Sequence, residues 1–201
     1  MNKIYTIGHS NHSIDYFYEL LKAFEINCLI DVRSFPYSKY ASQFNKESLQ
    51  NFLKSHRIEY LHFGKEFGAR KSEPDLLDVM GQVDFKKVQE TQDFKAGVER
   101  LREKITGGSV IALMCTEAEP LDCHRFSMIS SYLEQNDFSV FHILKDKTLI
   151  SQVELEEMVI KKSQPESIQL DFFGETIIQR DPKSAAYEQL NKKIGFRPTS
   201  N

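Results

Sequence analysis

Short, continuously apolar segments constrain the fold of this chain more than any other feature. Four of them, rich in Val, Ile, Leu or Phe, cover residues 3–7, 28–32, 110–115 and 139–144. Runs of this length are typical of β-strands, and hydrophobicity that does not alternate indicates strands buried on both faces. A further strand is expected at residues 58–63.

Amphipathic segments separate these strands. Apolar side chains recur at helical spacing after Ser13, a residue type favoured at helix N-caps. Further helices are expected at residues 46–56, at residues 94–105, from about Cys123, and after Ser151. Strands alternating with helices predict an α/β fold, in which a mostly parallel sheet is covered by helices on both faces as a Rossmann-like three-layer structure.

The chain is expected to form one α/β domain over residues 1–162, followed by a C-terminal extension over residues 163–201. Its length and hydrophobic content of 40% suffice for one substantial core. The residue pattern changes after residue 162. A hairpin over residues 168–179 and a short helix over residues 184–193 are predicted there.

Composition limits the classes of protein to consider. Acidic and basic residues nearly balance, giving a net charge of -3, so the chain as a whole is not suited to bind a polyanion. A nucleic-acid partner is therefore not favoured and would need a local basic patch. Three cysteines do not suit a disulfide-stapled secreted domain, which predicts reduced thiols. Neither a signal region nor a membrane-spanning run is apparent, so a cytoplasmic protein without a membrane partner is expected.

Candidate chemistry gathers just after the strands, because ligands of open parallel sheets bind at the carboxyl ends of the strands. Gly8 and Ser10 follow the first strand, and together with exposed amides at the start of the next helix they would suit a phosphate or carboxylate. The alternative is that they only form and cap the turn while His9 packs inside.

Arg33 ends the second strand, two residues after Asp31 and on the same face. Its guanidinium could hold an oxyanion by two parallel hydrogen bonds, and no acid stands out as its sole partner. A buried structural pair is the alternative.

The most informative constellation sets Cys115 at a strand end against Cys123, His124 and Arg125 at a predicted helix start. Such a start favours thiolates and anions. A phosphatase loop is excluded, because Leu121 occupies the position where its arginine would stand. A buried structural thiol remains an alternative for Cys115.

A zinc site would need Cys115, Cys123, His124 and a distant His9 or His12. The sequence lacks the paired Cys-x-x-Cys spacing of such sites, so neither a metal nor another cofactor is expected.

Residues 63–71 form a glycine-punctuated basic segment that could close over a ligand or be an ordinary solvated loop. The candidate catalytic residues are Cys115, His124 and His9. The candidate substrate-binding residues are Gly8, Ser10, Arg33, Glu117, Cys123, Arg125 and Arg70.

Taken together, these segments resemble the Domain of Unknown Function 488 family. The resemblance rests on residues 6–10, Asp31-Val32-Arg33 with Pro36 and Ser38, residues 67–68, residues 113–115 and residues 120–125. Ala69 departs from it, because a second glycine would be expected after Gly68. The resemblance implies a small α/β fold with a polar pocket, and it brings no reaction with it.

Two functions follow from the residues. The first is an enzyme, a hydrolase or group transferase, acting on a small phosphorylated or nucleotide-like substrate. The second is a non-catalytic binder of nucleotides or nucleic acid. Its candidate contacts are the basic residues Lys39, Arg70, Lys71 and Arg125 and the aromatic residues Phe35, Tyr37, Tyr40 and Phe67.

Overall fold

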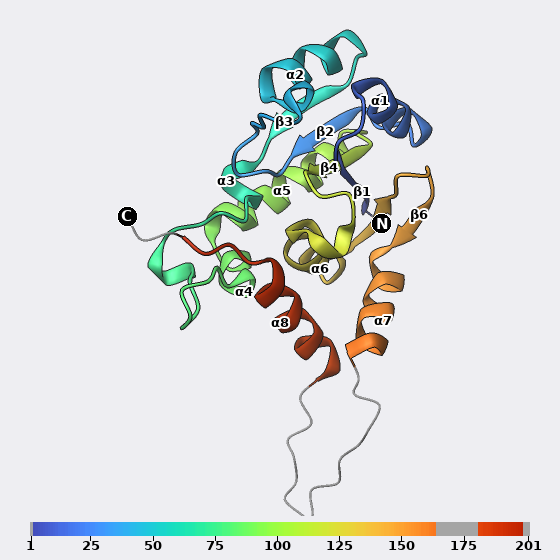
Figure 1. The fold of residues 1–201 in the computed structure, drawn as a ribbon. Helices are drawn as coiled ribbons and strands as arrows, with labels where there is room; N and C mark the ends of the chain where they lie inside the picture. Colours follow the sequence, from blue (N-terminus) through green and yellow to red (C-terminus); the bar gives the residue numbers. More distant parts are fainter. Residues whose placement is uncertain (1, 164–180, 199–201) are drawn as a thin grey trace, which may run out of the picture.

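A six-stranded sheet forms the centre of the molecule in the computed structural model, which describes residues 2–163 and 181–198 (Figure 1). The strands are β1 (Asn2–Gly8), β2 (Cys28–Asp31), β3 (Glu59–His62), β4 (Ile111–Cys115), β5 (Phe138–Ile143) and β6 (Leu149–Ser151). Their order is β3-β2-β4-β1-β5-β6. All neighbours run parallel except β5 and β6, so the predicted mostly parallel sheet is confirmed. The short antiparallel β6 was not predicted.

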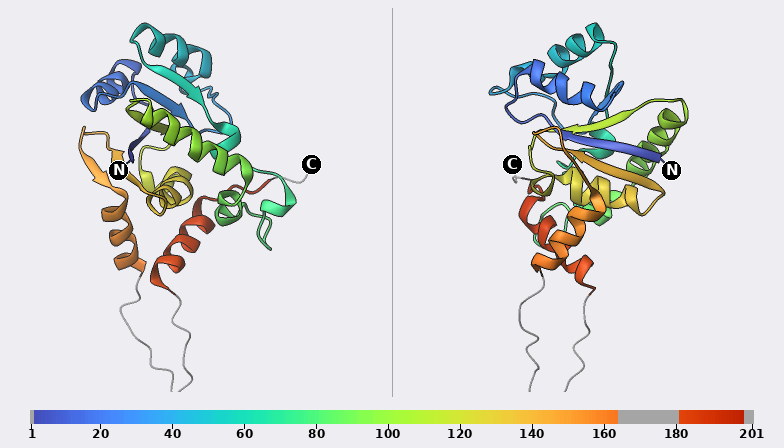
Figure 2. Two further views of the ribbon diagram at one scale, coloured as in Figure 1. Left: turned by 180° about the vertical axis from the view of Figure 1, so that it is seen from behind. Right: turned by 90° about the vertical axis from the view of Figure 1, so that its right-hand side faces the viewer.

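Helices cover both faces of this sheet (Figure 2). They are α1 (Ile14–Ala23), α2 (Lys46–Ser55), α3 (Gly64–Phe67), α4 (Phe85–Gln89), α5 (Gln92–Thr106), α6 (Ser131–Glu134), α7 (Gln152–Ser163) and α8 (Pro182–Ile194). Short 3-10 turns lie at Ser42–Phe44, Pro74–Leu76 and Pro120–Asp122, and a π-helix spans Arg125–Ser130.

The alternation of side chains along the strands divides the core into two clusters. Ile4 of β1 packs in the cluster that contains the buried face of α5, whereas Tyr5 and Ile7 pack in the cluster beneath α1 and α2. This division follows because successive side chains of a strand point to opposite faces. The three-layer arrangement predicted from the sequence is therefore present.

Local signals set several boundaries as expected. The Ser13 hydroxyl accepts a hydrogen bond from the amide of Tyr16 and caps α1. At the start of α7, the Ser151 amide donates to Glu154, whose own amide donates to the Ser151 hydroxyl. After α5, Gly108 adopts a positive φ of 88°, a conformation that glycine reaches without strain.

The helix predicted from about Cys123 is present: helical backbone begins at His124, after the 3-10 turn that Pro120 initiates, and continues as the π-helix Arg125–Ser130. One local prediction was wrong. Residues 63–71 are not simply a loop, because Gly64–Phe67 forms the helical turn α3 and Phe67 is fully buried. Packing of Phe67 in the core overrides the glycine-rich character of the segment.

The C-terminal helix α8 contacts the rest of the domain through polar groups. Asn191 accepts a hydrogen bond from the amide of Phe85, and Lys193 pairs with Asp122. The helix predicted at residues 184–193 is thus present as part of α8. The predicted hairpin lies outside the described residues, and the division at residue 162 stays a prediction. Within the described residues, no helix is long and apolar enough to cross a membrane.

A buried hydrogen-bonded chain joins β1, β5 and α7. His142 Nδ1 lies 2.7 Å from the Thr6 hydroxyl, and its Nε2 lies 2.9 Å from the side-chain oxygen of Gln152. Because an amide oxygen only accepts, Nε2 carries a proton. Burial, reinforced by the positive charge of Arg125, lowers the pKa of His142 to about 3.

The pKa of His142 predicts a loss of stability in acid. The unfolded chain binds a proton near pH 6.5 and the folded protein does not, so this site costs up to about 1.4 kcal/mol for each pH unit below 6.5. Urea unfolding between pH 7 and pH 4 should therefore fall less steeply in His142→Gln than in the wild type. Parallel pH profiles would contradict this assignment.

Candidate functional site

The carboxyl end of β4 is the point on which the candidate residues converge. Gly8 is paired with Cys115 across β1 and β4, and the amide of Val32 donates to the carbonyl of Met114 just beyond β2. The segments after β1, β2 and β4 therefore leave the sheet at one edge. This is the edge at which open parallel sheets bind their ligands.

The turn after β1 is held tightly against the segment after β4. The amides of His9 and Ser10 donate to the carbonyls of Cys115 and Thr116, at 2.9 and 2.8 Å. These two amides are therefore not available to an anion, since the hydrogen-bond ladder continues past the strands, whereas anion binding by the amides at the start of α1 stays a prediction. A Cβ on Gly8 would lie 1.8 Å from the carbonyl oxygen of Glu117, which explains why glycine occupies this position.

Arg33 has the carboxylate partner that the sequence did not single out. Its Nε donates to Asp31 at 2.8 Å, and one terminal nitrogen contacts both Asp31 and the carbonyl of Phe44. Asp31 also accepts a hydrogen bond from the Tyr60 hydroxyl at 2.8 Å. The alternative interpretation, a buried structural pair, describes these contacts. Anion binding by Arg33 stays a prediction that its hydrogen bonds do not favour.

His9 belongs to this buried pair and not to the thiols. Its Nε2 lies 3.1 Å from a terminal nitrogen of Arg33, and its ring stacks on Phe44 with centroids 4.3 Å apart. Burial, together with the nearby Arg33 charge, lowers the pKa of His9 to about 4. The imidazole is therefore neutral near pH 7 and completes the packing around Arg33. A catalytic role for His9 remains a prediction.

The thiols and one imidazole form a separate cluster. Nδ1 of His124 lies 3.8 Å from the sulfur of Cys115 and 3.8 Å from that of Cys123. The ligand atoms of these residues all lie within 4.8 Å of one another. Both cysteines are buried free thiols, with 3% and 1% of their surface exposed. We name this group the Cys115–Cys123–His124 cluster.

Glu117 links the cluster to the surface. One carboxylate oxygen accepts a hydrogen bond from the Cys115 thiol at 3.1 Å, while the residue as a whole is exposed. Glu117 was predicted to be a substrate-binding residue, but its hydrogen bond with Cys115 was not predicted. A carboxylate two positions beyond a strand-end cysteine was the signal that could have revealed it.

Within the cluster, the pKa values of the two thiols are shifted in opposite directions. A hydrogen bond to Cys123 and burial raise the pKa of Cys115 well above its ordinary value. Burial opposes ionisation of Cys123, but the hydrogen bond from Cys115 and the charges of Arg125 and His124 hold its pKa well below the ordinary value. The pKa of His124 is raised against burial by Cys123 and Glu117. Of the two thiols, Cys123 is therefore the one that ionises more readily.

Arg125 supports the loop that carries these groups. It is fully buried, and its terminal nitrogens donate to the carbonyls of Glu117 and Ala118. Because these donors serve the backbone, binding of an external anion by Arg125 stays a prediction without support from its contacts. A role in nucleic-acid contact is excluded for this side chain by its burial. The π-helix that begins at Arg125 is a rare form that often accompanies functional sites.

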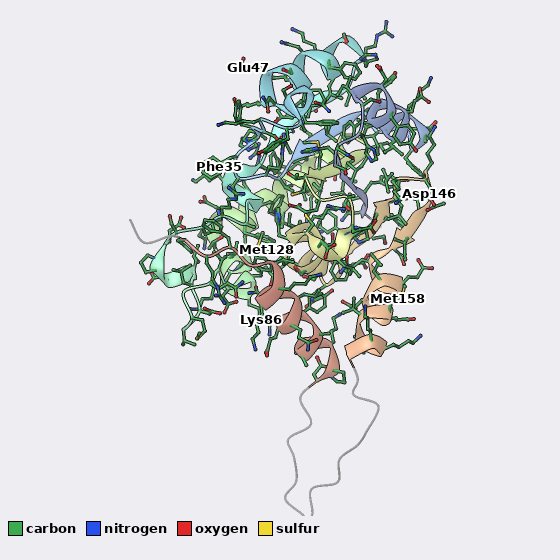
Figure 3. All side chains as sticks on the ribbon, viewed as in Figure 1. Phe35, Glu47, Lys86, Met128, Asp146 and Met158 are labelled. Atoms are coloured by element: carbon green, nitrogen blue, oxygen red, sulfur yellow. The ribbon has the colours of Figure 1, made fainter. Side chains whose placement is uncertain are left out.

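Exposed aromatic side chains gather on the loop that follows β2. Phe35, Tyr37 and Tyr40 are 66%, 69% and 101% exposed, and Figure 3 places Phe35 at the surface beside α3. Lys39 is also exposed, and no acidic residue occurs in residues 32–46. We name residues 35–40 the aromatic loop. Since β2 and β4 are neighbours in the sheet, this loop leaves the same edge as the cluster.

Arg70 lies close to the aromatic loop. Its amide donates to the hydroxyl of Ser34 at 2.9 Å, and its side chain is exposed.

A cleft of about 90 Å³ at this edge is lined by Gly8, His12 and Lys145 among others, so it holds only a few waters. A groove of about 750 Å³ lies elsewhere, between α4, the π-helix and α8. A ligand at the strand ends would thus bind on an open surface.

Comparison with known proteins finds a family model, described as Domain of unknown function DUF488, that matches residues 13–133. No curated protein and no solved structure matches the chain. The matched range contains β2, β4, the aromatic loop and the complete cluster.

Gly8 supplies a direct test of the tight turn. Alanine at this position would place a methyl group against the Glu117 carbonyl, so Gly8→Ala should lower the free energy of unfolding by more than about 2 kcal/mol. Gly107→Ala is the matched control, because its added Cβ meets its nearest neighbour at 3.4 Å, and it should cost less than about 1 kcal/mol. Equal effects in chemical denaturation would refute the close approach.

Proposed function

We propose, from the premise that the chain belongs to the family described as Domain of unknown function DUF488, that the protein is an enzyme. Its reaction class is hydrolysis or group transfer, and its substrate is a small phosphorylated or nucleotide-like molecule. The observation that carries the proposal is the meeting of two thiols, an imidazole and a carboxylate at the end of β4.

These groups suit chemistry better than packing. A purely structural core would favour apolar neighbours, whereas Cys115 lies against a carboxylate that reaches the surface. Glu117 is the acid–base group in this proposal, because an exposed carboxylate beside the cluster can exchange protons with substrate. The cluster itself is the reacting centre.

The aromatic loop supports the choice of substrate. Exposed rings offer faces on which a nucleobase can stack, and every base presents such a face. The exposed cations Lys39, Lys46 and Arg70 surround the loop, and Lys46 is tied to it by a hydrogen bond from its amide to the carbonyl of Pro36. We infer that these cations, rather than Arg33 and Arg125, bind the phosphate.

The compartment follows from the thiols. A reaction centre built on free, closely spaced cysteines needs a reducing environment to stay unlinked. We therefore infer a cytoplasmic protein.

Glu117 provides the test of the reaction. Purified protein is assayed against nucleotides, sugar phosphates and a phosphodiester, with release of phosphate or base as the readout. Glu117→Gln should lower kcat by about 100-fold or more, since a lost acid–base group has this effect. Glu119→Gln, an exposed carboxylate in the same loop, should stay within about twofold of the wild type.

Two results would count against the enzyme. One is a panel on which the wild type does no better than Glu117→Gln. The other is an active wild type whose rate falls equally in Glu117→Gln and Glu119→Gln, which would point to a general effect of charge in the loop.

A second candidate function, binding of single-stranded nucleic acid without catalysis, is favoured by the same aromatic loop. Three exposed rings with neighbouring lysines and no acidic residue over residues 32–46 are typical of such surfaces. The acidic net charge of the whole chain weighs against it.

Oligonucleotide binding distinguishes the two functions. If the surface binds single strands, affinity for a short single-stranded DNA should fall steeply with salt. Tyr37→Ala should weaken it at least fivefold, while Tyr37→Phe, which keeps the ring, should not. Absence of salt-dependent binding by the wild type would remove this candidate.

A further inference from the structure

We propose that the Cys115–Cys123–His124 cluster binds one zinc ion through its two sulfurs and the Nδ1 atom of His124. The inference deepens the proposed function by naming a cofactor for the same site. Metal binding is measured without substrate, so the two proposals can fail separately.

The spacing of the donor atoms carries the inference. Zinc–sulfur bonds of about 2.3 Å and zinc–nitrogen bonds of about 2.0 Å at tetrahedral angles hold sulfur and nitrogen about 3.5 Å apart. Nδ1 of His124 lies 3.8 Å from each of the two sulfurs. The two nitrogen–sulfur separations therefore need to shorten by only a few tenths of an ångström, and all three ligand atoms lie within 4.8 Å of one another.

The donors come from two segments that the fold fixes independently. Cys115 ends β4 in the middle of the sheet, and Cys123 with His124 follows the turn Pro120–Asp122. Arg125 holds the intervening loop through the carbonyls of Glu117 and Ala118. The site is thus preformed, which lowers the cost of ordering ligands around an ion.

The chemistry of the donors selects the class of metal. Thiolate sulfur and imidazole nitrogen suit Zn²⁺, whereas Mg²⁺ and Ca²⁺ prefer oxygen ligands. Two cysteines and one histidine leave a fourth position open, as in catalytic zinc sites. Glu117 borders that position from the exposed side, where its carboxylate contacts Cys115. A zinc ion there would supply an activated water for hydrolysis.

The sequence hypothesis of a zinc site chose the wrong fourth partner. His9 is bound to Arg33 and stacked on Phe44, and His12 packs against Tyr16. Neither histidine belongs to the group of donor atoms that the fold brings together. The proposed site therefore has three protein ligands, and Glu117 lies beside it through its contact with Cys115.

Metal titration of the full-length protein tests the inference. Protein stripped with a chelator and kept reduced is titrated with Zn²⁺ against a chromophoric chelator, and separately with Co²⁺. We expect one equivalent of each metal. The Co²⁺ form should have intense visible bands of a tetrahedral site and a sulfur-to-metal charge-transfer band. Thiocyanate should shift the visible bands if the fourth position is open.

Cysteine variants supply the matched control. Cys123→Ser should weaken zinc binding at least about 100-fold, because it removes a ligand. Cys28→Ser removes a thiol that is equally buried but lies in β2 away from the cluster, and it should bind like the wild type. Circular dichroism of each variant confirms that it is folded.

A wild-type protein that takes up less than 0.1 equivalent of either metal would overturn the inference, and this readout does not depend on any variant. Uptake that Cys123→Ser retains, or a Co²⁺ spectrum without the charge-transfer band, would also overturn it. If protein stripped of metal by chelator turned over substrate as fast as untreated protein, the proposed enzyme would be supported without a role for zinc.

Discussion

The hydrogen-bond ladder that holds β4 between β1 and β2 is the interaction on which the rest of the structure depends. It does not stop at the strand ends, because the amides of His9 and Ser10 continue it to Cys115 and Thr116. Only glycine at position 8 permits this approach, since a Cβ would meet the carbonyl of Glu117. The ladder therefore fixes both the position of Cys115 and the path of the loop that returns Cys123 to it.

The same close packing explains how the charges are used. Arg33 forms an ion pair with Asp31 within the core, and Arg125 donates hydrogen bonds to backbone carbonyls of the loop after β4. Both guanidinium groups are buried and bound to groups of the protein, so anion binding by these arginines stays a prediction that their contacts do not favour. Sulfur, imidazole and the carboxylate of Glu117 remain for chemistry, with exposed cations on and beside the neighbouring aromatic loop and at Lys145.

The elements that the sequence predicted best are those with continuous local patterns. Apolar runs located five of the strands, and Ser13 and Glu154 marked helix starts by their own hydrogen bonds. The rule that strand ends of a parallel sheet meet at one edge also predicted that Cys115, Cys123 and His124 lie together. Other contacts were not predicted: nothing near Thr6 indicated His142, and the hydrogen bond from Cys115 to Glu117 was missed. The helix that starts near Cys123 was predicted, but the 3-10 turn before it and its π-helical form were not, because these depend on packing rather than on local propensity.

The central claim, that this edge of the sheet is a reaction centre built on sulfur and imidazole, is tested most directly by X-ray absorption at the zinc edge of the zinc-loaded protein. The account predicts two sulfur neighbours at about 2.3 Å and one imidazole nitrogen at about 2.0 Å, with a light oxygen atom completing the shell. A shell of nitrogen and oxygen atoms without sulfur would contradict it, because the ion would then lie outside the Cys115–Cys123–His124 cluster.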